Sequence, residues 1–125
     1  IDLGTGRIPI AIAIGGGHSC AILDDDSLKC WGYNHYGNLG QGHAENIGDE
    51  TGEMGDNLPA IDLGTGRFAL NISAGVHHTC ALLEEDSIMC WGENDFGVLG
   101  QGNTENIGDE EGEMGDNLSA IDFGS

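Results

Sequence analysis

Positively charged residues are nearly absent from this sequence. Its 125 residues include 3 Lys and Arg against 22 Asp and Glu, which gives a formal net charge of -19. A surface of this sign repels the phosphates of nucleic acids and of anionic lipid headgroups. We therefore expect no nucleic-acid partner, whereas cations and basic proteins stay compatible with the charge.

Long apolar runs are missing as well. No stretch approaches the roughly 18 apolar residues that cross a bilayer, so we expect no membrane-spanning segment. Apart from the number of carboxylates, no pattern of residues indicates catalysis, and we predict that the chain is not an enzyme and has no organic cofactor.

The most informative feature present is an internal repeat. The segment IDLGTGR at residues 1–7 returns at residues 61–67 and begins again as IDFG at residues 121–124. Aligned without gaps, the two copies are identical at 38 of 60 positions, which indicates duplication. The sequence thus predicts repeat 1 over 1–60, repeat 2 over 61–120 and the start of a third over 121–125. Because about three such units are usually needed for stable stacking, we expect a longer, open-ended array.

Each copy has the patterns of β-structure. Residues 8–14 and 68–74 are apolar and end in glycine, which is typical of strands. After Trp31-Gly32 and Trp91-Gly92 the chain is too rich in Gly, Asn and Asp for a helix. We expect a long ordered loop there, with one short strand.

Between these segments lie HSCAILDDDSLKCWG (18–32) and HTCALLEEDSIMCWG (78–92). A three-residue loop at 24–26 would place Cys20 opposite Cys30, about 4.5 to 5.5 Å apart between Cα atoms, within reach of a disulfide. The same register pairs Cys80 with Cys90. Alternation makes both faces of the hairpin largely apolar, so we expect a neighbour on each side.

Taken together, GGGHSCAILDDDSLKCWGYNHYGNLGQG (15–42) and AGVHHTCALLEEDSIMCWGENDFGVLGQG (74–102) resemble the repeats of the regulator of chromosome condensation family. The resemblance implies an all-β fold with two tandem blade-like antiparallel units of the β-propeller type, in a family that usually closes about seven blades. Asp26 and Asp86 replace the turn glycine common in that family, and aspartate is among the residues that tolerate positive φ. The cysteine pairs are similar to the secreted, disulfide-bearing branch.

The function we expect is a non-enzymatic, extracellular or cell-surface segment that forms a structural or interaction surface. Its partners would be other copies of the same repeat, in the same chain or through self-assembly into a fibre. One alternative is a fragment of a closed, secreted propeller that binds a partner protein. A second alternative is a calcium-binding repeat.

Three kinds of site residue are candidates. His18 or His78 with the neighbouring cysteine pair would be a zinc site, although the cysteine spacing favours disulfides. Calcium would take oxygen ligands from two acidic, glycine-rich loops. Asn71 and Asn117 begin sequons and are candidates for N-glycosylation. The proposed calcium ligands are Asp49, Glu50, Glu53 and Asp56 and their copies Asp109, Glu110, Glu113 and Asp116.

The aromatic residues Trp31, Trp91, Tyr36 and Phe96 lie at fixed repeat positions beside glycines. Side chains in such positions are more often packing residues than a platform for a sugar or a base. We expect all four to be packed.

Overall fold

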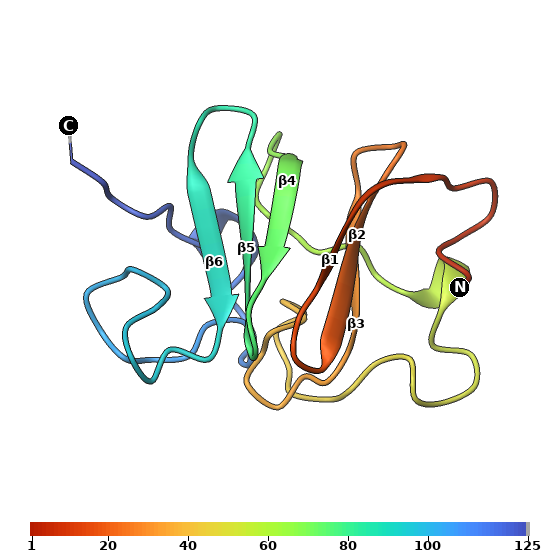
Figure 1. Cartoon of the computed structure of the whole chain (residues 1–125), viewed down its shortest axis with the longest axis horizontal. Helices are drawn as coiled ribbons and strands as arrows, with labels where there is room; N and C mark the ends of the chain where they lie inside the picture. Colours follow the sequence, from red (N-terminus) through yellow and green to blue (C-terminus); the bar gives the residue numbers. More distant parts are fainter. Residues whose placement is uncertain (125) are drawn as a thin grey trace.

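A computed structural model describes residues 1–124 and contains two three-stranded antiparallel sheets side by side (Figure 1). Each sheet has its strands in sequence order, and we call the sheets the first and the second blade. The all-β prediction with two blade-like units is confirmed. The strands are β1 (Pro9–Ile14), β2 (His18–Leu23) and β3 (Leu28–Gly32) in the first blade, and β4 (Ala69–Ala74), β5 (His78–Leu83) and β6 (Ile88–Gly92) in the second.

The cysteine hairpins have the predicted register. Cys20 lies opposite Cys30, and residues 24–26 form the loop, closed by a hydrogen bond from Leu23 N–H to Ser27 C=O. Asp26 has a φ of 69°, and its counterpart Asp86 has 65°. Aspartate tolerates this left-handed conformation better than most side chains, which explains how the loop forms without glycine.

The second half of each repeat is a long ordered loop. Instead of the expected short strand it has one isolated bridge, between Gly32 and Ile47, followed by the 3-10 turn η1 (Gly55–Asn57). Buried Asn34 anchors the loop, because its side chain donates to the carbonyls of His43 and Glu45. The second repeat has the same bridge, between Gly92 and Ile107, and the turn η2 (Gly115–Asn117).

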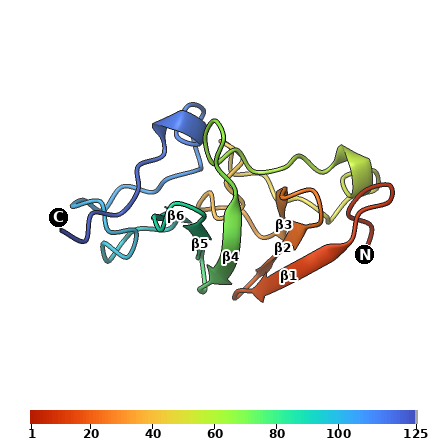
Figure 2. The ribbon, with the colours of Figure 1, turned by 90° about the horizontal axis from the view of Figure 1, so that it is seen from above.

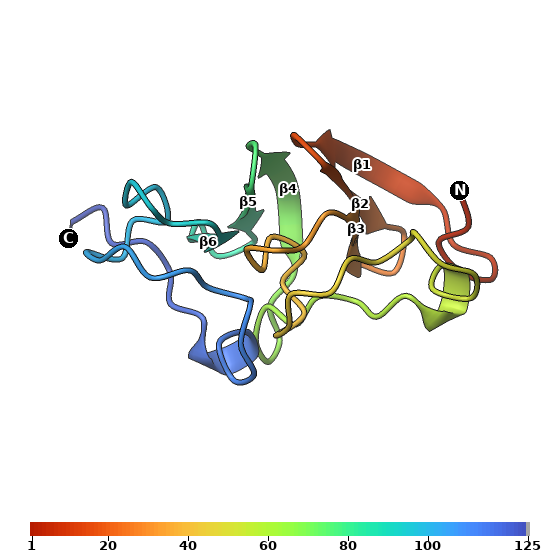
Figure 3. The ribbon, with the colours of Figure 1, turned by 90° about the horizontal axis from the view of Figure 1, so that it is seen from below.

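The two blades form a row rather than a closed body. Viewed from above and from below, the two sheets lie next to each other, and the long loops run along one side of the pair of sheets (Figures 2 and 3). The first and the last of the described residues lie at opposite ends of the long axis (Figure 1). Within residues 1–124, no helix has the length and apolar character needed to cross a membrane.

Candidate interaction site at the blade faces

Strand register divides each blade into two faces, because alternate side chains point to opposite sides of a sheet. We define a leading face and a trailing face. The leading face carries Ile12, Ile14, Ser19, Ala21, Lys29 and Trp31 in the first blade, and Ile72, Ala74, Thr79, Ala81, Met89 and Trp91 in the second. The trailing face carries Ala11, Ala13, Cys20, Ile22, Leu28 and Cys30 in the first blade, and Asn71, Ser73, Cys80, Leu82, Ile88 and Cys90 in the second.

The trailing face of the first blade packs against the leading face of the second. Ile22 on the trailing face is 1% exposed, and Ile72 on the leading face is 8% exposed. Strand β4 lies against both β1 and β2. Burial of these apolar side chains, at about 25 cal/mol per Å² removed from water, drives the contact. We call this contact the internal junction.

The other two faces are open. Ile12, the counterpart of Ile72, is 66% exposed, and Leu82, the counterpart of Ile22, is 40% exposed. A groove of about 310 Å³ runs along the leading face of the first blade, lined in part by Ile12, Ala21 and Trp31. A smaller groove of about 170 Å³ lies on the trailing face of the second blade. Each open face is therefore a copy of a surface that is covered at the internal junction.

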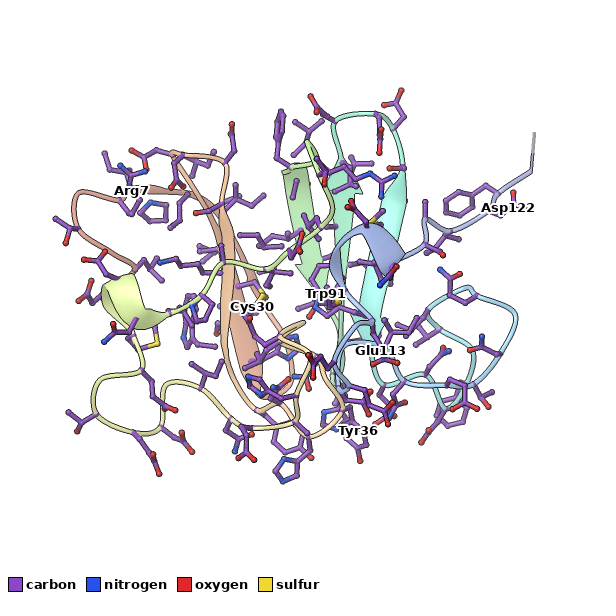
Figure 4. The ribbon with its side chains drawn as sticks, turned by 180° about the vertical axis from the view of Figure 1, so that it is seen from behind. Arg7, Cys30, Tyr36, Trp91, Glu113 and Asp122 are labelled. Carbon is purple, nitrogen blue, oxygen red and sulfur yellow. A yellow bond between two sulfur atoms is a disulfide. The ribbon has the colours of Figure 1, made fainter. Side chains whose placement is uncertain are left out.

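Trp91 is the largest side chain at the internal junction and is fully buried (Figure 4). It lies over Gly40 of the first repeat, where a Cβ atom would come within 2.8 Å of the indole Nε1. Gly40 also has a φ of 70°, so glycine is required there both for the turn and for the space. Trp31, the counterpart of Trp91, is only partly buried.

A polar chain crosses the same junction. The hydroxyl of Thr79 donates to the carbonyl of Asn38, 2.8 Å away, so it accepts from Nε2 of His18, also at 2.8 Å. This arrangement leaves the proton on Nε2 in neutral His18, and the buried Nδ1 has no partner within residues 1–124. Burial lowers the pKa of His18, and the nearby His77 and His78 lower it further. The junction therefore favours an uncharged His18.

An aromatic cluster closes one edge of the junction. The ring of His77 lies 5.2 Å from Tyr33 and 4.9 Å from Tyr36, measured between centroids. Tyr36 thus packs, as predicted, but Phe96 at the same position of the second repeat is almost fully exposed, so the packing prediction is wrong for it. Phe96 belongs to the side of the second blade that has no neighbour among residues 1–124.

The four cysteines form two disulfides, Cys20–Cys30 and Cys80–Cys90, each with Cα atoms 4.1 Å apart. Neither pair is left as thiolates, so the zinc alternative with His18 or His78 is wrong. The bonds link neighbouring strands within one blade, and Cys30 lies in the interior of the first (Figure 4). A short cross-strand link of this kind stiffens a hairpin without joining the two blades.

The acidic loops are organised by internal hydrogen bonds. Glu53 accepts from the backbone N–H groups of Gly48 and Glu50, and these bonds lower its pKa. Asp56 accepts from the N–H and hydroxyl of Thr5, which lowers the pKa of Asp56. Glu113 and Asp116 repeat these contacts in the second copy.

These bonds give the loop carboxylates a structural role in each repeat. Among residues 1–124 no three carboxylate, His or Cys side chains are grouped as metal ligands. The arrangement thus lends no support to calcium binding by Asp49, Glu50, Glu53 and Asp56 or by their copies. Calcium binding stays a prediction.

The two sequons lie in different settings. Asn71 is exposed on the trailing face of the second blade, and its side-chain oxygen accepts from the N–H of Ile72. Asn117 ends the turn η2, where its amide donates to the carbonyl of Gly112. Glycosylation at either position stays a prediction.

The segment IDLGTGR has a structural role that we did not derive from the sequence. Residues 61–67, which we call the internal strap, contact both blades. Ile61 N–H donates to Leu28 C=O of the first blade, and Asp62 C=O accepts from Gly115 N–H of the second repeat. The identity of this segment in both copies was the signal that it has such a role, since a free linker needs no fixed sequence.

Comparison with known proteins supports the repeat assignment. Residues 10–38 and 70–98 match the Regulator of chromosome condensation (RCC1) repeat. The human E3 ubiquitin-protein ligase HERC2 is 33% identical over 94 residues, covering 75% of this chain and 2% of HERC2. The Ultraviolet-B receptor UVR8 of Arabidopsis thaliana is 33% identical over 102 residues, covering 81% of this chain and 21% of UVR8. The chain therefore spans a small part of these relatives.

Solved structures give the same fold. Prp20p from Saccharomyces cerevisiae aligns with a TM-score of 0.67 at 19% identity, over 98% of this chain and 27% of Prp20p. Human WBSCR16 aligns with a TM-score of 0.66 at 17% identity, over 98% of this chain and 30% of that protein. At these identities the likeness concerns the fold alone.

Proposed function

This chain is an RCC1-like β-propeller repeat segment, and from this premise we propose that it is a protein-interaction segment whose open blade faces bind further repeats of the same kind. The observation that carries the proposal is the internal junction. At this junction one trailing face packs against one leading face. Among residues 1–124, the leading face of the first blade and the trailing face of the second blade stay uncovered.

The residues on the open faces fit such a contact. Leu82 and Ile88 take the places of Ile22 and Leu28 on the trailing face, so the apolar character of the central positions is kept. Ser19 takes the place of Thr79 on the leading face and has the same hydroxyl chemistry. His78 of one copy and Ser19 of another would therefore repeat the polar contact of the internal junction.

We place the segment outside the cell or at its surface. Two disulfides and no free cysteine among the described residues support this location, because such bonds persist in oxidising compartments. Stacking in one direction gives a ring when the rotation between blades closes and a fibre when it does not, and we propose the open row that grows into a fibre. The alternative is a closed propeller that binds a partner protein. Electron microscopy of the native material separates the two, since filaments favour the open row and rings favour the closed propeller.

The activities in the names of the relatives belong to those proteins and are not proposed for this chain. HERC2 is named as an E3 ubiquitin-protein ligase, and this chain matches 2% of it. Prp20p is described with binding properties to Gsp1p and histones, and it shares only the fold with this chain. That description of Prp20p is consistent with protein partners for repeats of this fold.

Two isoleucines of β1 provide the test, because they are equally exposed but differ at the internal junction. Ile12 is 66% exposed and its counterpart Ile72 is buried, whereas Ile10 is 64% exposed and its counterpart Leu70 is still 55% exposed. A glutamate at Ile12 therefore lies in the proposed contact, and a glutamate at Ile10 lies outside it. The two variants change the net charge by the same amount.

We expect the chain to self-associate in sedimentation equilibrium and Ile12→Glu to abolish the association, with Ile10→Glu much closer to the parent. Leu82→Glu should act like Ile12→Glu, because it alters the other open face. Equal behaviour of Ile10→Glu and Ile12→Glu, or a parent chain that stays monomeric at high concentration and high salt, would contradict the proposal.

A further inference from the structure

Four of the five histidines of the sequence gather at one edge of the internal junction. His18 belongs to β2 of the first blade, and the charges of His77 and His78, around the start of β5, act on it from the second blade. His35 lies against Tyr33, which in turn lies against His77, with ring centroids 4.7 and 5.2 Å apart. We call His18, His35, His77 and His78 the histidine cluster.

His18 is the buried member of the cluster, 3% exposed. Its Nε2 donates to the hydroxyl of Thr79 and so links the two blades. The other side of the ring lies against Gly15, where a Cβ atom would lie 2.9 Å from Nδ1. A second proton would therefore be added to Nδ1, which has no acceptor among residues 1–124.

The groups around His18 oppose that second proton. Burial, then His77 and then His78 lower the pKa of His18, whereas the backbone of His78 raises it and is the weakest of the four influences. The remaining polar contacts of the ring lead to uncharged groups, the hydroxyl of Thr79 and, beyond it, the carbonyl of Asn38. A charge on His18 is therefore not compensated while the blades are in contact.

The nearest carboxylates act on the aromatic edge of the junction instead. Tyr36, which lies 4.9 Å from His77 between ring centroids, is labelled at this edge in Figure 4. The pKa of Tyr36 is raised first by Tyr33, and then by Glu93, by burial and by Asp95. These two carboxylates can compensate a charge on His77, but neither acts on the buried histidine of β2.

The junction is also the part of the interior where polar atoms are least well satisfied. Four buried side-chain polar atoms of residues 1–124 have no hydrogen-bond partner, and all four belong to this junction: Nδ1 of His18 and of His77, Oδ1 of Asn38 and Nε1 of Trp91. Separation of the blades would open the side of the His18 ring that the second blade covers, so that water could hydrate the charged imidazole. Contact between the blades and a proton on His18 therefore oppose each other.

We propose that the internal junction is an acid-labile contact, in which uptake of a proton by His18 separates the two blades. The other members of the histidine cluster add charge at the same edge and act in the same direction. Each disulfide-linked hairpin keeps its own hydrogen bonds in this open state. The inference concerns a contact within the chain, so it does not require the open faces to bind further repeats.

Native-state hydrogen exchange of the whole chain, followed by NMR between pH 7 and 5, tests the inference, because it detects an opening even when the open state is rare. Two amides report on bonds between the repeats, Gly42 N–H to Gly108 C=O and Ile61 N–H to Leu28 C=O. Two report on bonds within the hairpins, Leu23 N–H to Ser27 C=O and Leu83 N–H to Ser87 C=O. Protection factors remove the intrinsic effect of pH on exchange, so the two pairs of amides can be compared directly.

The protection of Gly42 and Ile61 should fall by up to about tenfold per pH unit below 6.5, the ordinary pKa of histidine, for each proton that the opening takes up. At pH 5 it should be lower than the protection of Leu23 and Leu83. Equal protection at the two pairs of amides would overturn the inference, because the junction would then open only when the whole chain unfolds.

Two variants assign the effect to one imidazole. His18→Gln keeps a nitrogen that can donate to Thr79 but cannot gain a charge, so its protection factors should not change between pH 7 and 5. The matched control is His43→Asn, which removes an exposed histidine outside the cluster and introduces the residue of the second repeat, Asn103. The control should be preserved locally, because Asn103 accepts from a backbone N–H as His43 does, and it should behave like the parent. A pH dependence that persists in His18→Gln would overturn the inference.

If His18→Gln folds poorly, an NMR titration of the imidazole in the parent chain gives the answer. His18 should be neutral at every pH at which Gly42 and Ile61 keep the protection that they have at pH 7. A charged His18 in a chain with unchanged protection at these two amides would overturn the inference. The proposed function is tested separately, by the association of Ile12→Glu and Ile10→Glu at neutral pH.

Discussion

Trp91→Ala should destabilise this chain far more than Trp31→Ala, although the two tryptophans hold the same position in their repeats. Trp91 is fully buried between the blades, and Trp31 lines the open groove. A buried Trp→Ala change costs about 3 to 5 kcal/mol. For the partly exposed Trp31, the smaller area removed from water gives a cost of about 1 to 2 kcal/mol.

Thermal unfolding of the oxidised protein measures the difference. A gap of about 2 kcal/mol should separate the two midpoints by roughly 6 to 12 °C, at about 3 to 6 °C per kcal/mol for a chain of this size. Circular dichroism at low concentration is the appropriate readout, because self-association would bury Trp31 and mask the contrast. Equal losses in the two variants would refute the reasoning, since the internal junction would then contribute nothing that the open face lacks.

Two further outcomes follow from single side chains. The lowered pKa of His18 means that the folded state binds fewer protons than the unfolded state. The contribution of His18 to stability is therefore complete above the unfolded pKa near 6.5 and falls as the pH drops below it, by at most about 1.4 kcal/mol per pH unit. Urea unfolding between pH 7 and 5 should show this slope, and His18→Gln should lack it. Asp26→Gly should raise the stability by about 0.5 to 1 kcal/mol, because glycine adopts the φ of 69° without the Cβ clash. A loss of stability in the same unfolding assay would show instead that the Asp26 side chain stabilises the loop.

The hairpins could be predicted from the sequence because their register depends on neighbours in the chain. Once residues 24–26 form the loop, a period of two places Cys20 opposite Cys30 with no further information. The same alternation of side chains predicted that both faces of each hairpin are largely apolar. Local geometry was therefore sufficient for each cysteine hairpin and its disulfide, whereas the blade-like fold was expected from the family resemblance.

The contacts across the internal junction could not be predicted in this way. The bond between His18 and Thr79 joins residues 61 positions apart, and it depends on how one blade is seated on the other. The same holds for Phe96, whose exposure differs from that of Tyr36 because the second blade lacks a neighbour on that side. A repeat sequence predicts equivalent positions, but the number of neighbours decides which of them are covered.

The trailing faces of the two blades are not equivalent in polarity, and this limits what can bind to the second. Asn71 and Ser73 stand where the first blade has Ala11 and Ala13. The sequon at Asn71 lies on the face that a second copy would cover, so a glycan there and a stacked blade exclude each other. Asn117 lies in the turn η2, outside the strands that form this face. The predictions of glycosylation and of stacking are therefore compatible only if the glycan is attached at Asn117, or if the chain with a glycan at Asn71 is the last unit of its row.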